Sequence, residues 1–205
     1  TASTERVRIT SAGNVGIGET SPSSKFEIVS GNAASVVSGI KLKNDSTSAS
    51  GPGSSIDFVV DGVNDVTTAQ IIGQRTSANY HQGSLQFLTR DSGGAGLVER
   101  LRIHSSGQTS IGTTTLGHSS ADDLTINNSG NGGITIRTGT TSNGAIFFAD
   151  STSGDARFDG FVQYNHGTNP YMLFGTVGDE RLRITHEGEV RIPAGSNSTS
   201  RLTFG

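Results

Sequence analysis

Apolar and polar residues alternate over short runs along most of the chain. In residues 5–19, written ERVRITSAGNVGIGE, Val7 and Ile9 alternate with charged and polar residues, and alternation resumes two and four positions beyond Gly13. A period of two is typical of a strand with one buried face. Glycine adopts the left-handed backbone that a tight hairpin turn commonly needs. The stretch therefore predicts a small β-hairpin that turns at Gly13.

The same fifteen-residue pattern occurs twice more. It returns as ERLRIHSSGQTSIGT from Glu99 and as ERLRITHEGEVRIPA from Glu180, with turn glycines at Gly107 and Gly188. The glycine and the flanking alternation are present in all three copies, which indicates an architectural element. We expect all three glycines to have a positive φ.

The segments between these hairpins repeat more loosely. SGIKLKN (38–44) corresponds to GGITIRT (132–138), GSSIDFVVDG (53–62) to GAIFFADSTSG (144–154), and GSLQFLTRDSG (83–93) to NPYMLFGTVGD (169–179). Turn residues separate these runs, so each unit is predicted to hold about seven short strands. This predicts an all-β fold of tandem modules of short antiparallel strands. The modules are residues 1–98, residues 99–179, and a truncated third repeat over residues 180–205.

The composition indicates a thin core. Hydrophobic residues make up 31% of the 205, there are 29 glycines, and there is no cysteine. Small domains that bury little apolar surface are usually stabilised by disulfides, metals or other subunits. Disulfides are excluded, and no histidine has the spacing of a zinc ligand set, the five being His81, His104, His118, His166 and His186. Association with copies of the same chain is the remaining prediction.

Charge and hydropathy exclude two classes of partner. The net charge of −3 argues against a nucleic-acid-binding surface or an anionic membrane surface. No apolar run approaches the ~18 residues of a spanning helix, so no membrane insertion is expected. The chain begins with Thr1 rather than Met, and we expect it to be a piece of a longer protein.

The wording of the repeat resembles a known family. ERVRITSAGNVGIGETSPSSKFEI, from Glu5 to Ile28, is similar to the repeat of phage tail-fibre and related virion-fibre shafts. Those repeats combine Glu-Arg-x-Arg-Ile, a Ser-Gly-Asn turn, Val-Gly-Ile-Gly and a Thr-Ser-Pro-Ser-x-Lys-Leu segment. The second copy lacks the proline, and the third lacks Gly-Ile-Gly. The resemblance implies an elongated, intertwined homotrimeric fibre on a virus particle, joined to other fibre segments. Longer members often end in a self-cleaving chaperone domain, which nothing here matches.

The Glu-Arg-x-Arg core is the densest charge in the chain. Strict alternation would place both arginines of a copy on the face opposite the apolar pair. They could clamp an anion or a glycan, or they could pair with acids of neighbouring strands or subunits and fix register. We favour the structural interpretation, because a binding site need not recur in every module. The predicted structural residues are Glu5, Arg6, Arg8, Gly13, Glu99, Arg100, Arg102, Gly107, Glu180, Arg181, Arg183 and Gly188.

Catalytic, cofactor and metal residues are not predicted. The carboxylates that are close in sequence lie in turn-like segments, where acidic residues bond the local backbone, and these are Asp122 with Asp123, Asp155 with Asp159, and Asp179 with Glu180. Symmetry-related copies of His104 or His186 could meet on a three-fold axis, which leaves a metal there open.

The most site-like stretch is YNHGTNPY, residues 164–171. Sugar platforms are usually Trp or Tyr, and the chain has no Trp and three Tyr. Tyr164, His166 and Tyr171 are possible glycan contacts, although a surface loop explains the stretch equally well.

The leading hypothesis is a non-enzymatic segment of a trimeric virion fibre that projects or positions a host-recognition tip. The alternative is a receptor-binding module that recognises a host surface glycan. A polysaccharide depolymerase is the third possibility, and the lack of a carboxylate pair counts against it.

Overall fold

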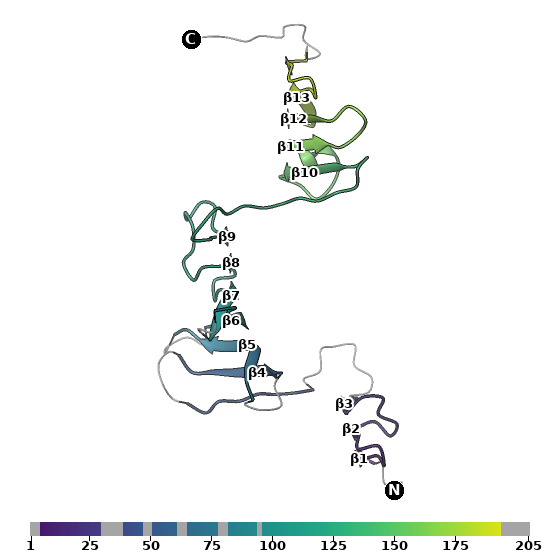
Figure 1. Ribbon diagram of the computed structural model, residues 1–205, viewed down its shortest axis with the longest axis vertical. Helices are drawn as coiled ribbons and strands as arrows, with labels where there is room; N and C mark the ends of the chain where they lie inside the picture. The colour runs from purple at the N-terminus through teal and green to yellow at the C-terminus, as the bar shows by residue number, and fades with distance from the viewer. Residues whose placement is uncertain are drawn as a thin grey trace. The chain divides into compact units, whose positions relative to one another are not determined.

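The protein is all-β. The computed structural model describes residues 5–29, 39–46, 51–60, 65–77, 82–93 and 96–193. These residues form three sheets, with one short 3-10 helix and no α-helix among them (Figure 1). The chain divides into two compact units, residues 1–132 and residues 133–205, and each is described by itself.

The first unit begins with a three-stranded sheet in the order β1-β2-β3. Its strands are β1 (Val7–Ile9), β2 (Val15–Ile17) and β3 (Phe26–Ile28). β1 and β2 form the predicted antiparallel hairpin, and β3 then pairs with β2 in parallel. The loop between β2 and β3 packs closely on Gly16, where an added Cβ would overlap the carbonyl oxygen of Glu19.

The second sheet of this unit has six strands in sequence order. They are β4 (Gly53–Val59), β5 (Thr67–Arg75), β6 (Gly83–Arg90), β7 (Leu97–Ile103), β8 (Thr109–Ile111) and β9 (Leu124–Ile126). Consecutive strands are antiparallel from β4 to β8, and β9 pairs with β8 in parallel. The predicted hairpin at Gly107 is therefore the β7–β8 turn.

The second unit holds five antiparallel strands, also in sequence order. They are β10 (Asn143–Phe148), β11 (Gly160–Asn165), β12 (Tyr171–Thr176), β13 (Asp179–Ile184) and β14 (Val190–Arg191), and the helix η1 (Asp155–Phe158) lies between β10 and β11. The third predicted hairpin is the β13–β14 pair. The segments that the sequence matched, 83–93 with 169–179 for example, contribute β6 and β12.

Two features of the predicted modules differ from the sheets. The segments 39–44 and 132–138 are described but form no strand, so each repeat has six strands among the described residues, β1–β6 and β7–β12, where about seven were expected. The module boundaries at 98/99 and 179/180 fall within β7 and β13. As units of sequence repetition, the three modules stay a prediction.

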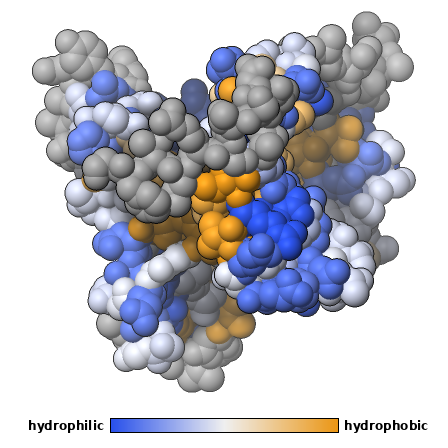
Figure 2. All heavy atoms as spheres, turned by 90° about the horizontal axis from the view of Figure 1, so that it is seen from above, coloured by the Kyte–Doolittle hydropathy of each residue, from blue (hydrophilic) through white to orange (hydrophobic). Residues whose placement is uncertain are grey.

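Burial in the single chain is the reverse of that in an ordinary globular domain. Within the described ranges, Leu173 is the one large apolar side chain that is buried, at 6% exposed, whereas Ser84, Gln86 and Ser110 are buried polar residues. Large apolar side chains are open to solvent in both units, and Figure 2 shows apolar residues at the surface in orange. Each sheet therefore presents an apolar face that the described residues leave largely exposed.

The three turn glycines have the predicted left-handed backbone. φ is +73° at Gly13, +99° at Gly107 and +85° at Gly188, which confirms the expectation. In each turn the glycine N–H donates to the carbonyl three residues earlier, at 2.9–3.0 Å.

We expect Gly107→Val to lower the stability of the protein by about 1–2 kcal/mol, because a β-branched residue is strained at this φ. Thermal unfolding followed by circular dichroism would measure it. Gly130→Val is the matched control, since Gly130 has no positive φ and no atom within 4 Å of an added Cβ. Equal melting temperatures for the two variants would contradict the prediction.

Candidate functional site

A β-bulge interrupts the repeated Glu-Arg-x-Arg motif in β7 and again in β13. In β7, Leu101 pairs with Phe87 and Glu99 with Leu88, so Arg100 has no partner residue across the strand pair. In β13, Leu182 pairs with Phe174 and Glu180 with Gly175, which leaves Arg181 in the same position. A bulge inserts one residue into one strand and so reverses the side on which later residues lie. Residues on either side of it no longer alternate.

In β7 and β13, the bulge makes a salt bridge inside the motif possible. Residues three apart in a regular strand lie on opposite faces, but the bulge brings Glu99 and Arg102 onto one face. Arg102 Nε donates to Glu99 Oε1 at 2.8 Å and Nη2 to Oε2 at 2.6 Å, and the two side chains are only 17% and 16% exposed. The hydrogen bonds with Glu99 raise the pKa of Arg102 above its ordinary value. Two parallel bonds in a fork give a rigid pairing.

The other copies contain the same bridge. Arg183 Nε donates to Glu180 Oε1 at 2.9 Å, and this pair is partly buried. Arg8 Nε donates to Glu5 Oε1 at 2.7 Å in a more exposed setting. The hydrogen bonds from Arg8 lower the pKa of Glu5 below its ordinary value, and the charge of Arg8 acts in the same direction. In all three copies the last arginine of the motif binds the glutamate that begins it.

The expectation that both arginines of a copy share a face is wrong for Arg100 and Arg181. Arg100 Nε donates to Thr89 Oγ1 at 3.0 Å, and Thr89 pairs with Val98 and Ala69 on the opposite face from Arg102. Arg181 donates likewise to Thr176 Oγ1. The bulge is the physical reason, because strict alternation does not survive an inserted residue.

These middle arginines also lie near acids of their own chain, but loosely. Arg100 Nη2 is 3.8 Å from Asp91 Oδ1, and Arg181 Nη2 is 3.4 Å from Asp179 Oδ2. Over the part of the chain that the structure describes, Arg6 has no acidic partner within 4 Å. Partners from a neighbouring chain stay a prediction.

The Glu99–Arg102 bridge belongs to a polar face of the six-stranded sheet. Arg102 pairs in register with Gln86 and Ser110. Gln86 Nε2 donates to Gln74 Oε1 at 2.6 Å and to Ser84 Oγ at 3.1 Å, and a ring nitrogen of His104 lies 2.9 Å from Ser110 Oγ. These buried groups bind one another, which is the pattern of a scaffold rather than of an open site.

The loop 112–123 covers part of this face. The Gly117 N–H donates to Thr125 Oγ1 at 2.9 Å, and Thr125 pairs with Ser110. Sequence reasoning missed the buried serines and glutamine, because the burial of a polar residue depends on what other segments of the chain pack over it. The alternation in GSLQFL, which puts Ser84 and Gln86 on one face, was the available signal.

The opposite face carries a row of apolar residues that crosses all six strands. Each member pairs in register with the next, and we call the row the apolar ladder: Ile56, Ile71, Phe87, Leu101, Ile111 and Ile126. Four of these side chains are 37–51% exposed, and Ile71 and Leu101 are half-buried. The five-stranded sheet has a matching row in Ile146, Val162, Phe174 and Leu182. Cross-strand apolar neighbours of this kind normally face a core.

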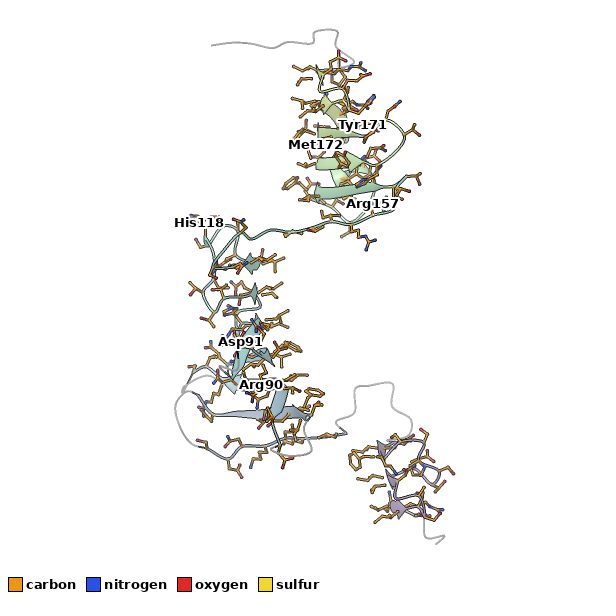
Figure 3. The ribbon with its side chains drawn as sticks, viewed as in Figure 1. Arg90, Asp91, His118, Arg157, Tyr171 and Met172 are labelled. Atoms are coloured by element: carbon orange, nitrogen blue, oxygen red, sulfur yellow. The ribbon has the colours of Figure 1, made fainter. Side chains whose placement is uncertain are left out.

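The possible glycan contacts do not share one face. The rings of Tyr164 and His166 meet with centroids 4.8 Å apart, and Tyr164 pairs in register with Met172. Tyr171 lies on the other face, where the Arg183 guanidinium stacks on its ring at 4.0 Å. Tyr171 and Met172 are neighbours in β12, labelled in Figure 3, and therefore point to opposite sides of the sheet. Tyr80 lies outside the described residues.

A polar pocket adjoins Tyr171. Its volume is about 470 Å³, and its lining includes Tyr171, Arg183, His186 and Arg191. Arg191 occupies the position across from the motif arginine that Gly16 and Ser110 occupy in the other two hairpins. The loop after the second strand covers Gly16, and the loop 112–123 reaches Thr125 beside Ser110. In the third hairpin the chain beyond residue 193 lies outside the described residues.

The acidic pairs do not form a catalytic arrangement at Asp179 and Glu180. Asp179 pairs with Thr176 and Glu180 with Gly175, so the two carboxylates lie on opposite faces. No group of three or more potential metal ligands occurs among the residues described. The same residues contain no helix that is long and apolar enough to span a membrane. A metal held by symmetry-related His104 or His186 stays untested.

No known protein-family model matches the chain, and no curated protein matches it. Solved structures that are similar to it include two of a bacteriophage tail fibre. The first is the carboxy-terminal domain of the bacteriophage T5 L-shaped tail fibre, with a TM-score of 0.36 and 14% identity, covering 86% of this chain and 92% of that chain. The second is the same domain with its intra-molecular chaperone domain, also with a TM-score of 0.36 and 14% identity. The match covers 85% of this chain and 63% of that one.

Proposed function

We propose that this chain is a non-enzymatic structural segment of a homotrimeric virion fibre, and that it projects or positions a host-recognition tip during attachment. The observation that carries the proposal is the uncovered apolar ladder. The repeat resembles the repeats of such fibres, and this resemblance is the reason for proposing three chains in the assembly.

The energetics favour covering the ladder. Fully burying one Ile, Leu or Phe side chain is worth about 1.5–3 kcal/mol, so each half-exposed member contributes about 1 kcal/mol when a neighbour covers it. With almost no buried apolar side chain of its own, the described chain has little else to offset the entropy of folding. Assembly and folding are then one process.

The repeated charges support a scaffold role. Each motif arginine that bonds its own glutamate has most of its charge satisfied within the chain. Such pairs fix the shape of the motif in every hairpin. A structural role requires the pair in each hairpin, whereas a receptor-binding site would require it in only one.

Light scattering at micromolar concentration tests the proposal. We expect a mass of three times the 21.2 kDa of one chain, with a single cooperative melting transition. A well-folded monomer with cooperative melting would overturn it.

The polar pocket beside Tyr171 favours a second candidate, a module that recognises a host glycan. Aromatic and guanidinium groups are suited to binding hydroxyl-rich sugars. Binding of the assembled chain to a glycan array, lost in the Tyr171→Ala variant, would promote this function. Release of reducing ends from a host polysaccharide would promote a depolymerase instead.

A further inference from the structure

Two segments have the pattern of strands but no strand partner among the described residues. They are residues 39–44, GIKLKN, and residues 133–138, GITIRT, and the structure describes both as irregular. Ile40 and Ile134 are 64% and 68% exposed. Neither segment makes a main-chain hydrogen bond to another described strand. Backbone groups in a sequence of this pattern are normally paired.

Each segment follows an edge strand in the sequence. β3 ends the order of the three-stranded sheet and β9 that of the six-stranded sheet, so each has one edge open in the described structure. An open edge offers a row of unpaired N–H and C=O groups to another strand. Residues 39–44 follow β3, and residues 133–138 follow β9.

The side-chain patterns of segment and edge agree. In β9, Leu124 and Ile126 lie on the face of the apolar ladder and Thr125 on the polar face. Placing Ile134 and Ile136 beside them extends the apolar face and sets Thr135 next to Thr125. Cross-strand Thr–Thr pairs are favourable.

The agreement at β3 includes charge. Phe26 and Ile28 share a face with Val15 and Ile17, and Glu27 lies on the other face. Aligning Ile40 and Leu42 with the two apolar residues brings Lys41 beside Glu27. Opposite charges across a strand pair are stabilising, whereas a one-residue slip would oppose apolar and charged side chains.

We propose that residues 133–138 of one copy add as a strand to β9 of a second copy and complete its sheet. Residues 39–44 have the pattern to add to β3, but Gly39 already lies beside β3 of its own chain, with its Cβ position 3.9 Å from Ile28 Cγ2. This inference rests on the proposed function, because it requires that copies of the chain assemble. It goes further in naming the strand that one copy contributes to the sheet of another.

The chain's own residues 133–138 do not pair with β9. Six residues separate Ile126 from Gly133, fewer than the connections 18–25 and 112–123 that join the parallel pairs β2–β3 and β8–β9. An antiparallel return is absent although residues 127–138 are described. Gly133 instead begins the second unit, where Ile136 Cγ2 lies 3.4 Å from the Cβ position of Gly144 in β10.

Cysteine cross-linking tests the strand addition, because the natural chain has no cysteine. The Thr125→Cys variant and the Thr135→Cys variant, with different affinity tags, are co-expressed and oxidised. Directly opposed strand residues have Cβ atoms about 4.5–5.5 Å apart, close to what a disulfide accepts. We expect a cross-linked species of about twice the 21.2 kDa chain mass that carries both tags.

Thr125→Cys combined with Thr138→Cys is the matched control. Position 138 lies three residues further along, on the other side of a strand, and should give no such species. Trimers by light scattering without the disulfide between positions 125 and 135 would overturn the strand addition and leave the fibre proposal standing. In a chain that carries both Thr125→Cys and Thr135→Cys, disulfides confined to single chains would overturn it as well. A monomer by light scattering would overturn both proposals.

Discussion

The Phe87→Ser variant should fail to assemble at micromolar concentration and should lose its cooperative melting transition. Phe87 lies in the middle of the apolar ladder, between Ile71 and Leu101, and is 37% exposed in the single chain. Removing a large apolar side chain from a packed interior costs about 3–5 kcal/mol. A loss of about 3 kcal/mol in each of three chains lowers the association constant of the trimer about a million-fold, because each 1.4 kcal/mol changes an equilibrium constant tenfold.

The control for this variant is Val177→Ser. Val177 is also strongly exposed, but it lies in the turn between β12 and β13 and outside the apolar rows. We expect it to assemble as the parent chain does, measured by light scattering and circular dichroism. In an isolated monomer, Phe87 makes only its contacts with cross-strand neighbours such as Ile71 and Leu101, so the loss of stability would be smaller. An unchanged mass and melting temperature for Phe87→Ser would show that nothing covers the ladder.

The Arg102→Ala variant should be less stable than the parent by about 2–3 kcal/mol. It leaves the Glu99 carboxylate unpaired at a position where the side chain is only 16% exposed, and an unpaired charge in a mostly buried setting is costly. For a protein of this size the loss corresponds to a fall of about 5–10 °C in melting temperature.

The Arg100→Ala variant provides the comparison. Arg100 is 48% exposed, and its nearest acid, Asp91, is 3.8 Å away. Exposed pairs contribute less than about 1 kcal/mol, so Arg100→Ala should change the melting temperature little. A larger fall in melting temperature for Arg100→Ala than for Arg102→Ala would mean that Arg100 binds an acid of a neighbouring copy. That contact, rather than the Glu99–Arg102 bridge, would then be the stabilising one.

The sequence alone was sufficient for the hairpins and their turns. Alternation around Gly13, Gly107 and Gly188 predicted three antiparallel pairs and a left-handed glycine in each, and both predictions are confirmed. These features are local, since a turn and its two flanking strands are specified within fifteen residues. The all-β class followed from the same alternation.

The bulge could not be predicted in the same way. A bulge is a relation between two strands, two residues facing one, and alternation within β7 alone gives no sign of it. The two faces of Tyr171 and Tyr164 were missed for a similar reason, because closeness in sequence does not tell which side of a strand a residue takes. The strands expected at residues 39–44 and 132–138 had the correct pattern, but a strand also needs a partner.

The bulge also sets how this chain can tolerate changes in length. Deleting Arg100 would remove the bulge and leave Glu99 and Arg102 two residues apart in a regular strand, still on one face. A gain of one further residue between Glu99 and Arg102, by contrast, would exchange the two faces for everything that precedes it in the strand. A change of two residues shifts the register but keeps each side chain on its side. We expect natural variation in length to collect in the loops between strands, and engineered insertions to succeed there rather than between Glu99 and Arg102.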